Sequence, residues 1–365
     1  MNDETRSALH LQSVHANPGR DNSRADGMKR RLDLSPAGVI RGIREGDRTV
    51  LAKAITLIES SRPEDRNIAE SVVEHCLGAS RNSIRVGVTG PPGAGKSSLI
   101  EAIGKYLVNE RREKIAVLAI DPSSALSGGS ILGDKTRMPF LSSSEMAFIR
   151  PSPSRGVHGG VAQRTREAIL LCEAAGYQNI LVETVGTGQS ECSVRNIVDF
   201  VLMVTIPGAG DELQGIKRGV MEIADLVVVN KADGGNLHAA ERARAEAESG
   251  LRLLPGMASG WSPRAVTCSA HTGHNIAGLW SCVLDYAAQT RANGWFDRAR
   301  GEQARHVLYQ DLEYGLMQMF RTNPGIQRRM AQIEQQVVSG ETTTANAVRE
   351  LLSLFAATAG NSRAL

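Results

Sequence analysis

The stretch GVTGPPGAGKSSLI, residues 87–100, decides the fold of this chain of 365 residues. It contains the pattern G-x-x-x-x-G-K-S, follows a run of apolar residues, and opens a helical pattern with Leu99, Ile103 and Leu107 on one face. Glycines let backbone N–H groups converge on a phosphate, and the N-terminus of the helix that follows adds a partial positive charge. The stretch therefore predicts a phosphate-binding loop and with it a bound nucleotide.

The residues of this loop have distinct expected roles. We expect Lys96 to be exposed at the loop and to reach the β- and γ-phosphates, and we expect the hydroxyl of Ser97 to bind Mg²⁺. The predicted phosphate-binding set is Gly90, Pro91, Pro92, Gly93, Ala94, Gly95, Lys96, Ser97 and Ser98.

Short apolar runs alternate with helical patterns from about residue 82 onward. The runs are residues 84–90, 115–121, 179–186, 200–208, 226–230 and 264–270. This alternation is typical of a parallel sheet with crossover helices, whose ligands bind outside the carboxyl ends of the strands. The sequence therefore predicts an α/β fold of the P-loop NTPase class, with a mostly parallel central sheet flanked by helices.

Helical patterns precede and follow the predicted sheet. Ser35 is the expected N-cap of the first helix, with Pro36 at its first position. We predict a disordered tail over 1–33, a helical segment over 34–81, a P-loop domain over 82–292 and a C-terminal helical arm over 293–365.

Two apolar stripes occur in the predicted C-terminal arm. The first consists of Leu308, Leu312, Leu316 and Phe320, and the second of Ile326, Met330, Ile333 and Val337. Such stripes either pack inside the chain or form a seam with a second copy, and the sequence leaves both open.

The composition excludes several classes of protein. The 42 basic and 39 acidic residues nearly balance, so neither nucleic acid nor a membrane surface is expected as the main partner. The sequence contains no run of about 18 apolar residues, so we expect no membrane-spanning helix. The five cysteines form no C-x-x-C pair, which favours a reducing, cytoplasmic location over a disulfide framework.

The segment VVVNKAD predicts which base is bound. Asp233 of this N-K-x-D pattern can accept the N1–H and N2 amino hydrogens of guanine together, whereas adenine offers no such pair of donors. The stem of Lys231 should cover the base, and Asn230 should brace the loops. The backbone of Ser269, Ala270 and His271, which closes the last apolar run, should contact guanine O6.

Mg²⁺ takes an octahedral set of oxygen ligands, so Ser97 needs further acidic partners. The candidates are Asp121 and Glu183, each at the end of an apolar run, and Asp134 in GGSILGDKTRM. Glu183 stands in E-T-V-G where many GTPases have D-x-x-G, which suggests contact through a metal-bound water. Each of these acids could instead be only a helix N-cap. Lys96, Asp121 and Glu183 form the predicted catalytic set, without an assigned general base.

Seven motifs in a fixed order carry a family resemblance. They are GPPGAGKSS, DPSS, GGSILGDKTRM, RPSPSRGVHGGVAQRTREA, ETVGTGQSE, PGAGDELQGIKRG and NKAD. In this order they resemble the metallochaperone-like GTPases that serve methylmalonyl-CoA mutase, the MeaB/ArgK family with its human counterpart MMAA. The resemblance covers roughly residues 40 to 330.

The resemblance implies a homodimeric GTPase that binds a cobalamin-dependent acyl-CoA mutase. It implies that GTP and Mg²⁺ are bound, and that the nucleotide state gates adenosylcobalamin loading and protects or reactivates the mutase. It also implies that residues 207–217 form a third switch, with Asp211 and Lys217 as its charged contacts. Methylmalonyl, ethylmalonyl and isobutyryl mutases all stay open as partners.

One position departs from the pattern of Ras-like GTPases. Those proteins have a water-orienting glutamine directly after the D-x-x-G glycine, whereas this chain has Thr187 there and Gln189 two residues later. Because positioning of the attacking water supplies much of the catalysis, we expect slow intrinsic hydrolysis.

Two other functions compete with this interpretation. A transport-linked kinase or ATPase would bind ATP, against which the guanine motif argues. A nickel-type metallochaperone GTPase would be expected to carry a His-rich or C-x-x-C segment, and this chain has neither.

Overall fold

The structure is a computed structural model of the full chain. It describes residues 35–60, 62–77, 82–121, 137–153, 160–184, 194–208 and 218–361, and every structural statement below concerns these residues. The predicted tail over 1–33 lies outside them, and the division into four segments stays a prediction.

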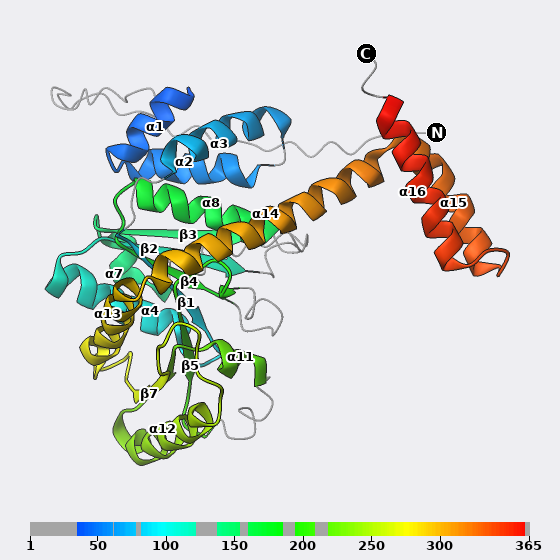
Figure 1. Ribbon diagram of the computed structural model, residues 1–365. Helices are drawn as coiled ribbons and strands as arrows, with labels where there is room; N and C mark the ends of the chain where they lie inside the picture. Colours follow the sequence, from blue (N-terminus) through cyan, green and yellow to red (C-terminus); the bar gives the residue numbers. More distant parts are fainter. Residues whose placement is uncertain are drawn as a thin grey trace, which may run out of the picture. The chain divides into compact units, whose positions relative to one another are not determined.

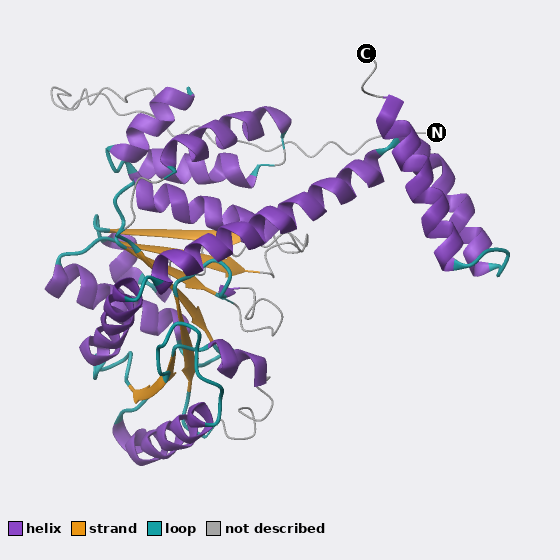
Figure 2. Cartoon of the chain, in the orientation of Figure 1, coloured by secondary structure: helices purple, strands orange, loops and turns teal. Residues whose placement is uncertain are grey.

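A seven-stranded parallel sheet forms the centre of the described chain (Figures 1 and 2), with the order β3-β2-β4-β1-β5-β6-β7. The strands are β1 (Ile84–Thr89), β2 (Ile115–Asp121), β3 (Ala147–Pro153), β4 (Asn179–Glu183), β5 (Phe200–Thr205), β6 (Leu226–Val229) and β7 (Arg264–Thr267). The predicted α/β class with a parallel sheet is confirmed.

One strand, β3, was missing from the sequence-based prediction. Its sequence AFIRPSP contains Arg150 and two prolines, which do not resemble a buried strand. Proline lacks the N–H that a central strand needs and is tolerated at a sheet edge, where β3 lies. Arg150 forms an ion pair with Glu59 of a neighbouring helix, which accounts for a charge at this position.

Helices surround the sheet (Figure 1). In chain order they are α1 (Pro36–Arg44), α2 (Arg48–Glu59), α3 (Pro63–Cys76), α4 (Lys96–Tyr106) with a π-helical continuation η1 (Leu107–Arg111), α7 (Pro139–Ser143), α8 (Gly160–Ala174), α11 (Arg218–Ile223), the short η3 (Gly234–Asn236), α12 (Leu237–Arg252), α13 (Ile276–Ala292), α14 (Trp295–Thr322), α15 (Pro324–Val338) and α16 (Thr344–Asn361). As predicted, Ser35 caps α1 by accepting a hydrogen bond from the backbone N–H of Gly38, and Pro36 follows it. No helix in the described ranges is long and apolar enough to cross a membrane.

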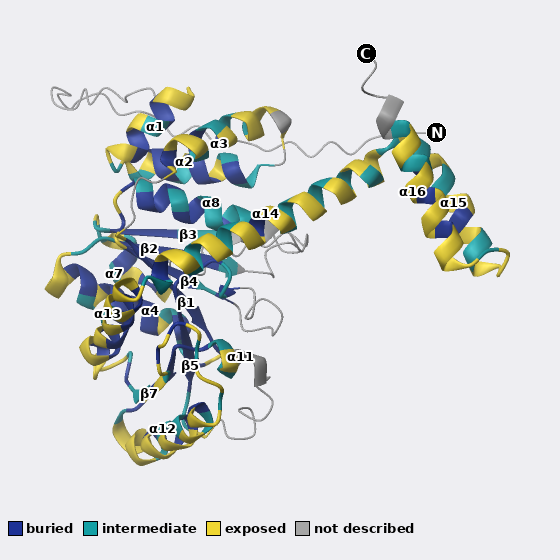
Figure 3. Cartoon of the chain, viewed as in Figure 1, coloured by how far each residue is buried: buried dark blue, intermediate teal, exposed yellow. Residues whose placement is uncertain are grey.

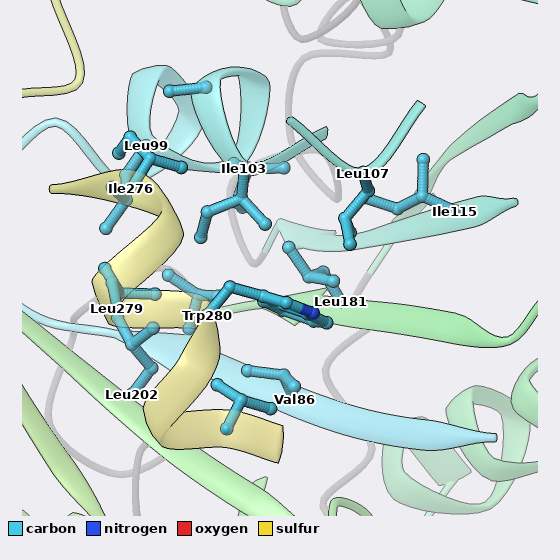
Figure 4. Close-up of a cluster of buried hydrophobic side chains, with 14 of the residues drawn as sticks. Val86, Leu99, Ile103, Leu107, Ile115, Leu181, Leu202, Ile276, Leu279 and Trp280 are labelled. Atoms are coloured by element: carbon cyan, nitrogen blue, oxygen red, sulfur yellow. The ribbon is translucent and has the colours of Figure 1, made fainter. Parts of the chain in front are cut away.

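The main hydrophobic core lies between one face of the sheet and the helices α4 and α13 (Figure 4). The predicted stripe Leu99, Ile103 and Leu107 is fully buried there, against strand residues such as Val86 and Leu202. This packing fixes the start of α4, and with it the phosphate loop, to the carboxyl end of the sheet.

The opposite face of the sheet is covered by other helices. Ala247 and Leu251 of α12 pack on Met203, Val227 and Ala265 of the strands. The helix α8 contacts α1, α2 and α3, and α2 also contacts the sheet domain directly, through the Glu59–Arg150 ion pair and the bond that Arg48 donates to the carbonyl oxygen of Ser144.

The two apolar stripes of the C-terminal helices have different environments (Figure 3). The second stripe packs inside the chain, where Ile326 and Ile333 of α15 contact Ala347 and Leu351 of α16. In the first stripe, Leu308, Leu312 and Leu316 of α14 are 64%, 54% and 51% exposed.

The first turns of α14 are fastened to the sheet domain by polar contacts. The guanidinium of Arg300 donates to both carboxylate oxygens of Asp199, at 2.8 and 2.6 Å. The side-chain amide of Gln303 donates to the backbone carbonyls of Arg195 and Val198, at 3.1 and 2.7 Å. These bonds hold residues 195–199, which lead into β5, against the helix.

Candidate nucleotide-binding site

The predicted phosphate loop leaves β1 through Gly90 and enters α4 through Gly95. Gly90 has φ 138°, and a Cβ atom there would lie 2.1 Å from the carbonyl oxygen of Val204. Gly95 has φ 85°, and a Cβ there would lie 2.6 Å from the side-chain nitrogen of Asn230. Both conformations favour glycine, and neither position has room for a side chain. The glycines of the motif are therefore required by the shape of the loop.

Lys96 is the first residue of α4, and its side chain is curled back over the loop. Its ammonium group donates to the carbonyl oxygens of Gly90 and Pro91, at 2.8 and 3.1 Å. Only 9% of the residue is exposed, so the expectation of an exposed lysine was wrong. The loop closes around the lysine, which places the positive charge inside the concave side of the backbone.

The start of α4 fits a phosphate and a magnesium ion. Among the described residues no side chain caps its first N–H groups, and its first turn contains no acid, so the positive end of the helix can bind an anion. The hydroxyl of Ser97 donates to the carboxylate of Glu183 at 2.8 Å. These are oxygen ligands of the kind that Mg²⁺ prefers, and phosphate and water would complete the set.

The other predicted metal ligands are only partly described. Asp121 is the last residue of β2, the strand next to β4, but its side chain lies outside the described part of the chain. Asp134 lies outside it altogether, as do Asp211 and Lys217 and the positions Thr187 and Gln189. No group of three or more His, Cys, Asp or Glu side chains that could hold a metal ion occurs within the described ranges.

Asn230 joins the phosphate loop to the predicted guanine loops. Its amide nitrogen donates to the carbonyl oxygen of Ala94 at 2.9 Å, and its amide oxygen accepts from the backbone N–H of Ala270 at 3.1 Å. The side chain therefore bridges the loops that follow β1, β6 and β7, which the sequence places far apart.

The sequence-based reasoning missed one neighbour of Asn230. The thiol of Cys268 lies 3.7 Å from the amide oxygen of Asn230 and donates to it. Burial raises the pKa of Cys268 to about 12, so the donor proton stays in place at neutral pH. Its position directly before Ser269 was the only available signal.

The remaining predicted guanine contacts gather on the same loops. The carboxylate of Asp233 accepts a hydrogen bond from the hydroxyl of Ser269, which fixes one of its two oxygens. Lys231 has φ 61°, an uncommon conformation for a residue with a side chain, and it is exposed, as is His271. The two loops thus present a carboxylate and a lysine stem together, whereas the backbone N–H groups of Ser269 and Ala270, predicted to contact guanine, donate instead to the carbonyl oxygen of His274 and the amide oxygen of Asn230.

A parallel sheet whose phosphate loop is bridged by an asparagine to an N-K-x-D loop defines a P-loop GTPase. The family model described as "Methylmalonyl Co-A mutase-associated GTPase MeaB" matches residues 51–325. The chain belongs to this MeaB family and hydrolyses GTP.

Similar proteins agree with this assignment. GTPase ArgK of Escherichia coli (strain K12) is 43% identical over 86% of this chain and 94% of its own length. The Methylmalonic aciduria type A homolog, mitochondrial, of Mus musculus is 42% identical over 86% of this chain and 78% of its own. A solved structure titled LAO/AO transport system kinase has a TM-score of 0.71 and 36% identity, and the match covers 88% of this chain and 97% of that one.

Replacing Asp233 by asparagine tests the guanine assignment. We expect the affinity for GTP to fall by about 10- to 150-fold, because a hydrogen bond to a charged group contributes about 1.5 to 3 kcal/mol. Affinity for xanthosine triphosphate should rise, because an amide N–H can donate to the 2-carbonyl of xanthine. Titration calorimetry measures both, with Asp285→Asn on the surface of α13 as control. Undiminished preference for GTP over ATP would contradict the assignment.

Proposed function

We propose that this chain is a cytoplasmic GTPase chaperone of a cobalamin-dependent acyl-CoA mutase, with methylmalonyl-CoA mutase as the first candidate. Hydrolysis of GTP to GDP would gate adenosylcobalamin loading and protect or reactivate the mutase. The Asn230 bridge between the phosphate and guanine loops is the observation that carries the GTP-dependent part. The family description, which names methylmalonyl-CoA mutase, supports the choice of partner.

Each predicted side chain has a role in this proposal. Lys96 would exchange the carbonyls of Gly90 and Pro91 for oxygens of the β- and γ-phosphates. The backbone N–H groups from Gly93 to Ser98 would hold the phosphates. These contacts bind and orient the triphosphate, which is where most of the rate enhancement in phosphoryl transfer originates.

Mg²⁺ would be held by Ser97 and, through water, by Glu183, with Asp121 and Asp134 as further ligands. When bound, it would neutralise negative charge on the phosphates. Because Thr187 replaces the water-orienting glutamine, we propose slow turnover by the isolated protein and faster turnover once the mutase is bound. Asp211 and Lys217 would contact the mutase.

We further propose that the chain forms a homodimer through its C-terminal helices. The exposed leucines Leu308, Leu312 and Leu316 recur every fourth residue along α14, and Tyr309 and Met317 beside them are exposed as well. A second copy that covers this face would remove a contiguous apolar surface from water, which is the main driving force of association.

The proposal is tested with the purified full-length protein and methylmalonyl-CoA mutase from the same organism. We expect slow GTP turnover by the isolated protein and an increase of at least about tenfold when the mutase is added, which corresponds to about 1.4 kcal/mol of activation free energy. Serum albumin should leave the turnover unchanged, and ATP should not be hydrolysed. Light scattering of the isolated protein should give the mass of a dimer.

A second measurement identifies the partner without assuming it. The tagged protein, loaded with GDP or with a non-hydrolysable GTP analogue, is recovered from native extract, and mass spectrometry identifies what stays bound in each state. The proposal would be contradicted if the protein hydrolysed ATP and GTP equally well and if no cobalamin-dependent mutase changed its rate of GTP turnover.

A further inference from the structure

The segment 194–199, which leads into β5, contacts both the strand that carries the phosphate loop and the helix α14. In the sequence it is separated by only ten residues, 184–193, from Glu183 at the end of β4. Glu183 accepts a hydrogen bond from Ser97 of the phosphate loop at 2.8 Å. The segment therefore follows closely on the nucleotide site along the chain and touches α14 in space.

Two valines of this segment pack on the backbone of β1 at Gly87. A Cβ atom on Gly87 would lie 2.9 Å from Cγ2 of Val194 and 3.1 Å from Cγ2 of Val198, and both valines are buried. A glycine inside a strand often marks a place where another part of the chain approaches closely, as it does here. Because Gly87 comes three residues before Gly90, the segment rests on the strand from which the phosphate loop begins.

The carboxylate of Asp199 joins β1 to the first turns of α14, residues 295–307. Its Oδ2 atom accepts a hydrogen bond from the backbone N–H of Arg85 in β1 at 2.9 Å and another from the guanidinium of Arg300 at 2.6 Å. Its Oδ1 atom accepts from Arg300 as well, at 2.8 Å. Asp199 is buried, so water screens these bonds little. One carboxylate thus holds the strand, the segment and the helix together.

A buried cluster of balanced charge surrounds this carboxylate. Arg85 donates to both carboxylate oxygens of Glu173 in α8, at 2.8 and 3.0 Å. The guanidinium of Arg300 lies 3.8 Å from the same carboxylate. Together with Asp199 the cluster has two positive and two negative charges, so withdrawal of Arg300 would leave an excess negative charge buried, which is strongly unfavourable. The first turns of α14 therefore follow Asp199 rather than separate from it.

The guanidinium of Arg300 is also held in place by its own helix. It lies 4.5 Å from the centre of the buried ring of Phe296, one turn earlier in α14, and the guanidinium of Arg291 lies 4.6 Å from the same ring. Arg300 further donates to the carbonyl oxygen of Ser83 at 3.0 Å. With so many contacts, the side chain cannot absorb a displacement of Asp199 by changing its rotamer, and the helix has to move instead.

Binding of Mg²⁺ changes the contact from which this chain of interactions starts. The hydroxyl of Ser97 donates directly to Glu183, whereas the proposed role of Glu183 places a metal-bound water between them. Two oxygens that share a bridging water lie farther apart than two oxygens joined by a direct hydrogen bond. Glu183 and Ser97 therefore have to separate when GTP and Mg²⁺ are bound.

We propose that residues 194–199 transmit this change to α14, so that binding of GTP and Mg²⁺ shifts the first turns of the helix. Asp199 passes the displacement on, and Arg300 and Gln303 receive it, the latter through its bonds to two backbone carbonyls of the segment. The inference rests on the proposed role of Glu183 and is independent of the mutase. It makes these three residues regulatory, because none of them lies at the nucleotide site.

The experiment follows amide hydrogen exchange in the full-length protein, once without nucleotide and once saturated with Mg²⁺ and a non-hydrolysable GTP analogue. We expect the exchange rates of residues 194–200 and 299–307 to change together, each by about threefold or more, because exchange reports local stability. Calorimetry on the same samples shows whether the analogue is bound, which distinguishes a failure of this proposal from a failure of GTP binding.

Two variants interrupt the transmission. Arg300→Gln removes the charge that holds Asp199, and Gln303→Ala removes the two bonds to backbone carbonyls without leaving a charge unpaired. In each variant we expect residues 194–200 to respond to the analogue as in the original protein, whereas the response of residues 299–307 falls to about half or less. Thermal melts show that each variant is folded.

The matched control is Arg150→Gln. It removes another partly buried ion pair between distant elements, the one with Glu59 of α2, and should leave both responses unchanged.

Three results would overturn the proposal. In the first, residues 194–200 respond to the bound analogue and residues 299–307 do not. In the second, neither range responds although the analogue is bound. In the third, α14 responds equally in the original protein and in both variants, which would mean that the change reaches the helix by another route, such as a second copy of the chain.

Discussion

Replacing Lys96 by alanine is expected to weaken the binding of GTP and GDP by about a thousandfold or more. The ammonium group is held inside the loop by the carbonyls of Gly90 and Pro91, where it is positioned to meet the phosphates. Hydrogen bonds to charged groups contribute about 1.5 to 3 kcal/mol each, and the lysine is expected to make two of them. No other lysine or arginine of α4 lies close enough to the phosphate loop to replace Lys96, since Lys105 is more than two helical turns further along.

The measurement is titration of both nucleotides by calorimetry, with a thermal melt of the nucleotide-free protein. Lys105→Ala is the matched control, because Lys105 lies on the same helix, is half-exposed, and contacts Glu101 and the ring of Phe140 rather than the phosphate loop. We expect the control to bind nucleotide normally and the Lys96 variant to melt within a few degrees of the original protein. GTP affinity retained within about tenfold, which is about 1.4 kcal/mol, would contradict the assigned role of Lys96.

Replacing Gly90 by alanine is the second substitution with a large expected effect. The new Cβ atom would lie 2.1 Å from the carbonyl oxygen of Val204, which is backbone and cannot rotate away. The positive φ of 138° adds conformational strain of about 1 to 3 kcal/mol. The loop must therefore separate from β5. We expect the affinity for nucleotide to fall by at least about a hundredfold, which is about 2.7 kcal/mol of binding free energy, and the melting temperature to fall as well.

The variant Gly176→Ala distinguishes the effect of the steric clash from the effect of the strained backbone conformation. Gly176 also has a positive φ, 82°, but no atom lies within 4 Å of the position that its Cβ would take. We expect this variant to lose only the strain energy and to bind GTP normally. If the Gly90 variant bound GTP as well as the Gly176 variant does, the close approach of the loop to β5 would be without functional importance.

The sequence predicted the parts of the site whose chemistry is local. The phosphate loop and the N-K-x-D loop depend on residue types at fixed spacing, and the role of Asn230 as a brace between loops is consistent with its two hydrogen bonds. The edge strand β3 escaped prediction because prolines are unusual in a strand except at a sheet edge, and because the charge of Arg150 is balanced by the distant Glu59.

Other features depend on how distant residues meet, and no local pattern contains that information. The burial of Lys96 follows from the path of the loop, which curls around the side chain. The contact of Cys268 with Asn230 requires β6 and β7 to be neighbours.

The fastening of α14 has a mechanical consequence. Arg300 and Gln303 bind residues 195–199, Val307 is buried one turn further on, and from there the helix continues as far as Thr322, a length of about 22 Å at 1.5 Å per residue. If the helix stays straight, a tilt of about 8° about Val307 displaces its far end by about 3 Å. A small rearrangement before β5 would thereby be amplified into a movement comparable to the width of a side chain.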